Sequence, residues 1–592
     1  MDSIKSFKGY GKVDAIEDQE FRRKTRKRII IIAVSVVVLL TLIIAAVVGV
    51  SIHKTNNDDG NEATSPSSSS STLANSIKAV CSVTHYPNSC FSSLSSLETK
   101  AATTSNKAAD PEELFKLSME AAVNELSKLS TLPNKLIAKT NNVRDKAALL
   151  DCQSLYQEAI DQLNTSISSM QSDGNGKLLT ASKIDDMKTW LSASLTDLQT
   201  CLDGLEETNS TSLEEVRKAM QSSTELTSNS LAIVSKIINL LQDFDLPIHR
   251  RLRKLLEFGI EFPEWVGPTD RKLLQQEDTT TKPNVTVAKD GTGNFKTITE
   301  AVASIPKKSA SRFLIYVKQG VYEENVILDK KKWNVMMYGD GKTKTIVSGN
   351  LSFVGGTPTF ATATFVVVGK GFIAKDIGIR NTAGAQNHQA VALRSGSDLS
   401  VFYRCSFDGF QDTLYAHSNR QFYRDCDITG TIDFIFGNAA VVFQKCNILP
   451  RQPMANQFNT ITAQGKTDQN QNTGISIQRC NILPLDNVTA STYLGRPWKN
   501  YSTTVIMQSE IAAVVDSTGW TPWIPNTLPP STIFYAENQN TGPGSAVDKR
   551  VTWEGYKSTI TDQQASQFTV NNFIQGSDWL PQTTVTYDAS LQ

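Results

Sequence analysis

Two amides and two carboxylates recur at nearly constant spacing in the C-terminal half of this 592-residue chain. Gln411 follows Gln389 by 22 residues, and Asp433 follows Asp412 by 21. If one coil of a β-structure takes about 21 residues, side chains one coil apart lie about 4.8 Å from each other. The spacing alone therefore predicts that these four groups converge on one face. Paired carboxylates indicate either acid–base catalysis or a metal site.

The sequence disfavours a catalytic histidine and a zinc site. The chain has five histidines, of which His388 and His417 lie in the C-terminal half, and neither accompanies a G-x-S-x-G elbow. We expect both to be surface or supporting groups. The sequence has no C-x-x-C pair and no H-x-x-x-H cluster, which disfavours zinc. No cofactor is predicted.

A short repeat indicates which elements position these groups. Phe402-Tyr403-Arg404-Cys405 recurs as Tyr423-Arg424-Asp425-Cys426, Phe443-Gln444-Lys445-Cys446 and Ile477-Gln478-Arg479-Cys480, so the cysteines step by 21, 20 and 34 residues. A period near 20, with one strand in fixed phase, is typical of a right-handed parallel β-helix. The long step predicts a coil that carries an inserted loop. A β-propeller would need a period of about 40 and is disfavoured.

The segment before the repeats reads as helical. Leu191, Leu195, Leu198, Leu202 and Leu205 follow helical spacing, and three further runs lie after Asp110-Pro111 and around 147–163 and 213–241. Four amphipathic helices predict a four-helix bundle over residues 75–245. The expected fold is thus multi-domain: an all-α bundle followed by an all-β parallel helix over 275–592.

The N-terminal segment predicts a membrane anchor. Residues 29–50 form an apolar run long enough to span a bilayer, and a basic stretch from Arg22 to Arg28 should keep the 1–28 leader cytoplasmic. A cleaved signal peptide is the alternative. Residues 51–74 read as a Ser-rich linker. Six sequons beyond it agree with lumenal exposure, at Asn164, Asn209, Asn284, Asn350, Asn487 and Asn500.

Five blocks in the C-terminal half carry a family resemblance. They are Gly320-Val321-Tyr322-Glu323-Glu324, Gln389-Ala390-Val391-Ala392-Leu393-Arg394, Gln411-Asp412-Thr413-Leu414-Tyr415, Asp433-Phe434-Ile435-Phe436-Gly437 and Leu494-Gly495-Arg496-Pro497-Trp498. In this order they resemble the signature blocks of plant pectin methylesterases. The helical segment, with its four cysteines, resembles the plant invertase and pectin methylesterase inhibitor family.

The resemblance implies an aspartyl esterase that demethylates galacturonate. Asp433 would be the nucleophile and Asp412 the proton donor. Gln411, helped by Gln389, would stabilise the oxyanion, and Arg496 would hold Asp433 ionised. The resemblance also implies six substrate contacts: Thr359, Gln389, Tyr415, Phe434, Arg496 and Trp498.

The resemblance also implies three disulfides, 81–90 and 152–201 in the bundle and 426–446 between coils. The coil geometry itself would equally allow a 405–426 bridge. Cys480 could simply be a small buried apolar residue.

Two basic clusters lie in the predicted linker 246–274, each followed by Leu-Leu. They resemble the processing motifs of this enzyme family, and Arg271-Lys272-Leu273-Leu274 is the predicted cleavage motif, with a site after Leu256 as the alternative. A processing protease is therefore an expected partner, together with methylesterified pectin, the chain's own inhibitor-like domain and separate inhibitor proteins. The precursor should be membrane-anchored in the secretory pathway and the mature enzyme should be extracellular, in the cell wall. The formal net charge is zero, and no nucleic-acid partner is expected.

Two rival hypotheses remain open at this stage. Another pectin-acting β-helix, a polygalacturonase or pectate lyase, would also use acidic residues. The chain could instead act mainly as an inhibitor or wall-binding protein with an inactive β-helix. The Gln-Asp and Gly-Arg-Pro-Trp blocks favour the esterase over the first, and the retained Asp412, Asp433 and Arg496 argue against the second.

Overall fold

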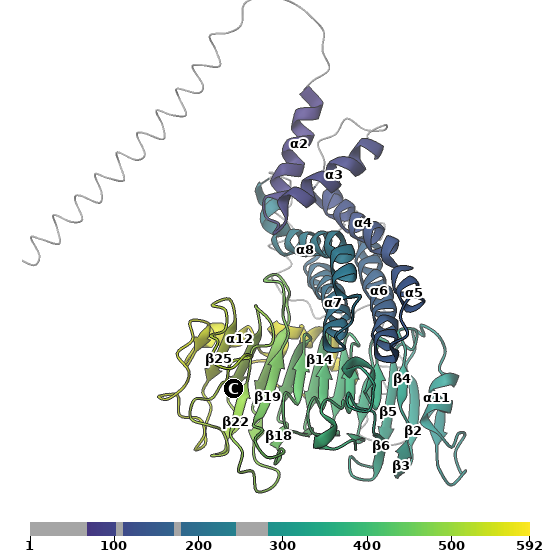
Figure 1. Cartoon of the computed structure of the whole chain (residues 1–592), viewed down its shortest axis with the longest axis vertical. Helices are drawn as coiled ribbons and strands as arrows, with labels where there is room; N and C mark the ends of the chain where they lie inside the picture. Colours follow the sequence, from purple (N-terminus) through teal and green to yellow (C-terminus); the bar gives the residue numbers. More distant parts are fainter. Residues whose placement is uncertain (1–67, 102–110, 171–178, 244–281) are drawn as a thin grey trace, which may run out of the picture. The chain divides into compact units, whose positions relative to one another are not determined.

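The computed structural model describes residues 68–101, 111–170, 179–243 and 282–592 (Figure 1). The predicted leader and anchor (1–50) and the predicted cleavage motif at 271–274 lie outside these residues. Among the helices of the described ranges, none is long and apolar enough to cross a membrane.

The N-terminal part of the described chain is helical, and its four longest helices form the predicted bundle. α6 packs on α7 and α4, and α8 packs on α4 and α7. Asn142 caps α6 by accepting hydrogen bonds from the backbone amides of Arg144 and Asp145. The bounds are α2 (Ser68–Cys81), α3 (Pro87–Ala101), α4 (Pro111–Leu129), α5 (Leu132–Ile137), α6 (Val143–Ser169), α7 (Ala181–Glu207) and α8 (Leu213–Asp243).

Two details of this part bear on the sequence predictions. The disulfides Cys81–Cys90 and Cys152–Cys201 are both present, and the second joins α6 to α7. Both predicted pairings are confirmed. The Ser-rich linker is shorter than predicted, because α2 already begins at Ser68.

The C-terminal part is a parallel β-helix of three sheets, as Figure 1 shows. Neighbouring strands in each sheet pair in parallel, and each central coil gives one strand to each sheet in turn. Leu393 pairs with Leu414, and Leu414 with Ile435, so the coil length here is the predicted 21 residues. The pairing of Phe443 with Ile477 spans the predicted longer coil.

The strands are as follows. The eleven-stranded sheet contains β1 (Val285–Val287), β2 (Phe313–Val317), β5 (Val335–Gly339), β8 (Ile373–Lys375), β11 (Ser400–Tyr403), β14 (Arg420–Arg424), β17 (Ala440–Gln444), β20 (Gly474–Gln478), β23 (Thr503–Met507), β25 (Phe534–Asn538) and β26 (Tyr556–Lys557). The eight-stranded sheet contains β3 (Gly320–Glu323), β6 (Thr345–Gly349), β9 (Gly378–Asn381), β12 (Ser406–Asp408), β15 (Asp427–Gly430), β18 (Asn447–Pro450), β21 (Asn481–Ile482) and β24 (Glu510–Ile511). The seven-stranded sheet, which carries the candidate site, contains β4 (Val326–Leu328), β7 (Phe365–Val367), β10 (Leu393–Ser395), β13 (Leu414–Ala416), β16 (Ile435–Gly437), β19 (Asn459–Gln464) and β22 (Thr492–Gly495).

The repeated motif marks one corner of each coil. The residue before each cysteine is left-handed, with φ of 53° at Arg404, Asp425 and Lys445 and 54° at Arg479. The chain turns there from the eleven-stranded to the eight-stranded sheet, and the following cysteine points into the core.

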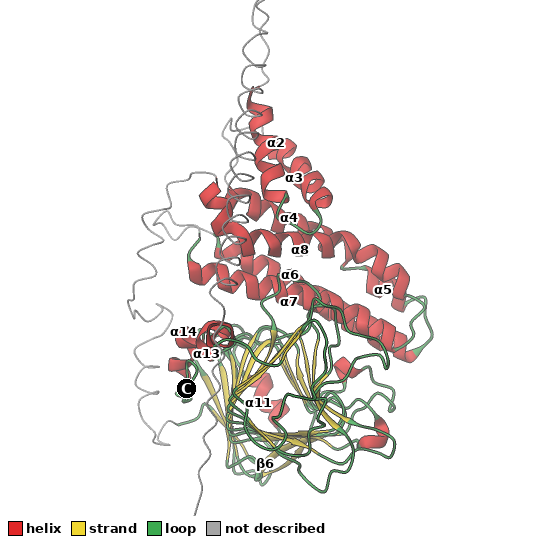
Figure 2. Ribbon diagram, turned by 90° about the vertical axis from the view of Figure 1, so that its left-hand side faces the viewer, coloured by secondary structure: helices red, strands yellow, loops and turns green. Residues whose placement is uncertain are grey.

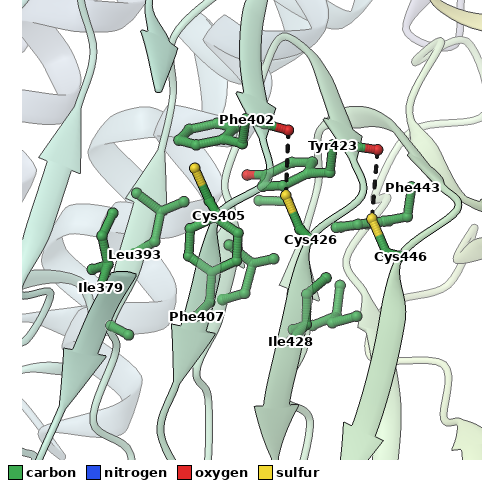
Figure 3. Packing of buried hydrophobic residues seen from close by; sticks show 14 of the residues in the cluster. Ile379, Leu393, Phe402, Cys405, Phe407, Tyr423, Cys426, Ile428, Phe443 and Cys446 are labelled. Atoms are coloured by element: carbon green, nitrogen blue, oxygen red, sulfur yellow. Dashed lines mark hydrogen bonds between the residues drawn. The ribbon is translucent and has the colours of Figure 1, made fainter. Parts of the chain in front are cut away.

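The four corner cysteines are buried free thiols, so the predicted 426–446 bridge is wrong for this structure. Figure 3 shows the thiols of Cys405, Cys426 and Cys446 in a column among stacked aromatic rings. Cys426 donates to the carbonyl of Phe402 at 3.3 Å, and Cys446 to that of Tyr423 at 3.6 Å. Adjacent parallel strands lie about 4.8 Å apart, which is wider than the Cβ separation of about 3.8 Å that a disulfide needs.

Short helices lie at both ends of the β-helix. α11 (Ile298–Ser304) is held by a Thr297–Glu300 capping box and packs into the core at the first coils (Figure 2). α12 (Asp562–Ser566), α13 (Val570–Ile574), α14 (Gly576–Trp579) and the 3₁₀ turn η3 (Leu580–Thr583) follow the last strand. Val570, Ile574 and Leu580 pack on the outer face of the eleven-stranded sheet.

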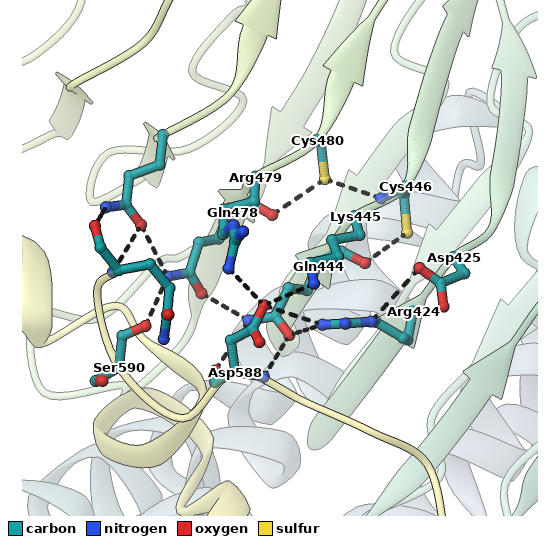
Figure 4. Close-up of polar contacts among 12 residues, drawn as sticks. Arg424, Asp425, Gln444, Lys445, Cys446, Gln478, Arg479, Cys480, Asp588 and Ser590 are labelled. Atoms are coloured by element: carbon teal, nitrogen blue, oxygen red, sulfur yellow. Dashed lines mark hydrogen bonds and ion pairs between the residues drawn. The ribbon is translucent and has the colours of Figure 1, made fainter.

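The C-terminal tail is fastened across several coils of that face (Figure 4). Gln444 and Gln478 donate side-chain hydrogen bonds to the carbonyls of Asp588 and Ser590, at 2.9 and 3.1 Å. The Asp588 carboxylate pairs with Arg424 at 3.3 Å and Arg479 at 3.0 Å. The tail therefore ties successive coils together.

Candidate active site

The two predicted catalytic carboxylates occupy equivalent positions on adjacent coils. Asp412 and Asp433 each lie two residues before a strand residue, Leu414 and Ile435, and these two are register partners. Both aspartates have left-handed backbones, with φ of 63° and 50°, and both are buried. Left-handed φ at non-glycine residues is uncommon, and it often marks functional positions.

Asp433 is fixed by a cationic fork and a hydroxyl. Arg496 donates from Nε to Oδ1 at 2.8 Å and from Nη2 to Oδ2 at 2.6 Å. Thr460, on β19, donates its hydroxyl to Oδ1 at 2.6 Å. A bidentate arginine contact of this kind both orients a carboxylate and stabilises its charge.

Asp412 has a different electrostatic environment. Burial raises the pKa of Asp412 well above its usual range, the charges of Asp433 and Glu207 raise it further, and Arg496 lowers it. Asp412 is therefore biased towards the protonated form, beside a carboxylate that is clamped by arginine.

A cavity of about 440 Å³ opens beside both aspartates. Gln389 and Gln411 line it, and their coils are joined by a 3.2 Å backbone hydrogen bond from Ala390 N to Gln411 O. Of the predicted substrate contacts, the cavity brings together Thr359, Gln389, Tyr415, Arg496 and Trp498.

Phe434 does not belong to the cavity, so this predicted substrate contact is wrong. Its side chain is fully buried in the core of the β-helix. The left-handed turn at Asp433 interrupts the strand alternation, so that both Phe434 and Ile435 point inward. Phe436 lines the cavity instead, with its ring stacked on Tyr415 at 4.1 Å.

Other cavity residues were missed by sequence reasoning. The ring centroid of Trp523 lies 4.3 Å from the Arg496 guanidinium carbon, and Lys499 and Phe360 also line the cavity. Side chains alternate between the two faces of a strand, so an inward Ile435 would have indicated that Phe436 faces the cavity. Trp523 lies in a loop outside the signature blocks, where no repeat indicates its direction.

The C-terminal turns of α7 form part of the cavity wall. Glu207 accepts hydrogen bonds from the backbone amide of Thr359 at 3.1 Å and from its hydroxyl. Asp203, one helical turn earlier, pairs with Lys499 at 2.6 Å. His417, expected to be a surface or supporting residue, is fully buried and lies 3.0 Å from Thr200 of α7, whereas His388 is exposed.

The six sequon asparagines all lie exposed, which leaves each accessible to modification.

The described chain combines a parallel β-helix, a cleft with paired carboxylates and amides, and a helical bundle that lines part of that cleft.

Comparison with known proteins agrees with this architecture. Residues 284–577 match the pectinesterase family, and residues 75–233 match the plant invertase/pectin methylesterase inhibitor family. The chain is 58% identical over 597 residues to pectinesterase 3 of Phaseolus vulgaris, with all of both chains covered. It is 57% identical to pectinesterase 1 of Arabidopsis thaliana, covering 99% of each.

A solved structure matches the β-helix. The pectin methylesterase from carrot is 52% identical, with a TM-score of 0.52, and the match covers 53% of this chain and 100% of the carrot chain. The chain therefore belongs to the pectinesterase family and carries an inhibitor-family domain at its N-terminal side.

Proposed function

We propose that this chain is a pectin methylesterase precursor, whose β-helix hydrolyses the C6 methyl esters of galacturonate residues in pectin. The observation that carries the proposal is the pairing of unlike carboxyls. Asp433 is clamped by Arg496, while burial raises the pKa of Asp412 on the adjacent coil. A nucleophile and an acid are the two groups that an ester with a poor alkoxide leaving group requires.

In the first half of the reaction, a carboxylate oxygen of Asp433 attacks the C6 carbonyl carbon of the ester. Gln411 and Gln389 donate hydrogen bonds to the oxygen that becomes negatively charged. As the bond to the methoxy oxygen breaks, Asp412 transfers its proton to that oxygen and methanol leaves. The products are an acyl-enzyme on Asp433 and an ionised Asp412.

In the second half, water attacks the acyl carbon and Asp412 takes its proton. The Asp433–acyl bond breaks, which frees a galacturonate carboxylic acid and restores both aspartates. Aromatic side chains of the cleft, Tyr415, Phe436 and Trp498, supply faces for sugar rings. Thr359 supplies polar contacts to the polymer.

We further propose that the helical domain restrains the precursor. The carboxylate of Glu207 accepts hydrogen bonds from the backbone amide and the hydroxyl of Thr359, and Asp203 forms an ion pair with the ammonium of Lys499. Both acids come from α7 and line the cavity. A pectin chain could not use these groups until α7 moves away.

Maturation is then the step that releases the enzyme. Cleavage after Leu274 or Leu256 would remove the bundle and the predicted anchor at 29–50, and would leave the β-helix in the cell wall. This part of the proposal rests on the sequence: the two basic Leu-Leu motifs and the apolar run after basic residues.

The proposal is tested with residues 275–592 and with the uncleaved chain. The carrot enzyme, whose whole chain is matched by the β-helical half alone, supports the use of this fragment as a folded unit. Methanol release from methylated pectin should be fast with the fragment and slow with the uncleaved chain. Equal rates would refute the restraint, and no methanol from the fragment would refute the esterase.

A further inference from the structure

Arg394 lies beside the cavity but has no part in the mechanism above. It is the register partner of Tyr415 on the seven-stranded sheet, and Tyr415 in turn stacks on Phe436. Both aromatic residues line the cavity. Arg394 thus extends this row of side chains by one coil.

The guanidinium of Arg394 is held by an aromatic ring of the cavity wall. Its central carbon lies 3.5 Å from the ring centroid of Phe360, which lines the cavity. A cation–π contact fixes a guanidinium group through its face and leaves the N–H groups at its edge available for a planar anion.

Two of the three guanidinium nitrogens lack partners among the described residues. Arg394 is 8% exposed, and its Nε and Nη1 atoms are among the buried atoms of the described residues with no hydrogen-bond partner. Burial lowers the pKa of Arg394, against the opposing charges of Glu158, Asp151 and Asp197. Unpaired buried donors destabilise a fold, and a residue that breaks a packing rule in this way points to function.

The acids that face Arg394 all come from α6 and α7. They act on Arg394 through their charge, whereas in the cleft itself the ammonium of Lys499 pairs directly with Asp203 of α7 at 2.6 Å. The helical domain therefore pairs a carboxylate with Lys499 in the cleft and brings further carboxyl groups near Arg394. A partly demethylated pectin chain presents the same chemistry.

We propose that Arg394 is an anion-binding residue of the released cleft, and that its ligand is the free carboxylate of a galacturonate that has already lost its methyl ester. This inference rests on the proposed esterase function. A guanidinium group binds a carboxylate through two charge-assisted hydrogen bonds. It binds a neutral methyl ester more weakly, because the ester carries no charge. Arg394 would therefore direct the enzyme to esters that lie near demethylated residues.

The test compares residues 275–592 with the variants Arg394→Gln and Arg394→Lys. Arg404→Gln is the matched control, because Arg404 is a half-exposed arginine of the β-helix that pairs with Asp376 at 2.6 Å. KM and kcat are measured on nearly fully methylated pectin and on partly demethylated pectin. Binding of fully demethylated polygalacturonate is measured separately by calorimetry.

For Arg394→Gln we expect KM on partly demethylated pectin to rise about tenfold, a typical loss for a charge-assisted hydrogen bond. On nearly fully methylated pectin both constants should stay close to wild type, which also reports intact folding. Polygalacturonate should bind about tenfold more weakly. For Arg394→Lys, KM on partly demethylated pectin should lie between the values of wild type and Arg394→Gln. Arg404→Gln should match wild type.

Equal changes on both pectins, or unchanged polygalacturonate binding, would overturn the role of Arg394. A wild-type fragment that released no methanol from either pectin would refute the proposed esterase instead. In that case polygalacturonate binding still decides the role of Arg394, because it requires no turnover.

Discussion

Arg496 donates hydrogen bonds to both carboxylate oxygens of Asp433, with N–O distances of 2.8 and 2.6 Å. The arginine follows β22 and the aspartate precedes β16, so the contact reaches over the intervening strand β19. Thr460 of β19 donates to the same carboxylate. Residues from three elements thus fix the orientation of the Asp433 carboxylate.

Replacing Arg496 by Ala should lower kcat by about 10²–10³, the usual loss when a preorganised electrostatic contact is removed. KM should change less, because the contact acts on the nucleophile. The control is Arg404→Gln, which removes a surface pair with Asp376. Near-normal turnover of Arg496→Ala on methylated pectin would contradict the role given to this arginine.

Asp412 should make stability depend on pH. Because its folded pKa is raised, its contribution to stability is present below the unfolded value of about 3.9 and is lost as pH rises through the folded value. Asp412→Asn removes the titrating group. The variant should therefore melt at a higher temperature than wild type at neutral pH, and the difference should close near pH 4.

Asp548→Asn, at an exposed carboxyl, is the matched control and should show no such gap at either pH. A constant difference between Asp412→Asn and wild type across the pH range would mean that burial of Asp412 does not penalise its ionised form.

Glu207→Gln in the uncleaved chain should raise methanol release. The substitution keeps the shape of the side chain but weakens two charge-assisted hydrogen bonds to Thr359, each worth about 1.5–3 kcal/mol. We expect an increase of about tenfold or more, measured before any cleavage. Glu215→Gln, on the exposed side of α8, should leave the rate unchanged. If Glu207→Gln did so too, α7 would not restrain the cleft through this residue.

The thiol content of the chain tests the cysteine assignment. Cys405, Cys426, Cys446 and Cys480 are free, so an unreduced chain that is unfolded in denaturant should give four reactive thiols. A count of two would indicate that a bridge between coils forms after all.

Much of the β-helix could be predicted from the repeat, because coils stacked in register force a fixed period. The 21-residue step from Asp412 to Asp433 predicted their equivalent positions, and the pairing of Leu414 with Ile435 agrees. Periodicity could not resolve what happens within a turn. Phe434 was expected in the cleft, but the left-handed Asp433 before it turns the ring into the core.

Contacts between distant segments also could not be predicted from the sequence. Nothing in the heptad-like spacing of α7 indicates that Glu207 reaches Thr359, since the same carboxylate would suit a solvated helix end. The predicted 426–446 bridge failed for a related reason: correct stacking of two cysteines does not bring their β-carbons within bonding distance.

The most direct test of the central claim is methanol release from methylated pectin by residues 275–592, with the length of the polymer followed in parallel. Wild type should release methanol and leave the chain length unchanged. Asp433→Ala should release none, because the variant lacks the carboxylate that forms the acyl-enzyme. Shortened polymer, or normal methanol release by Asp433→Ala, would contradict the assignment of an aspartyl esterase.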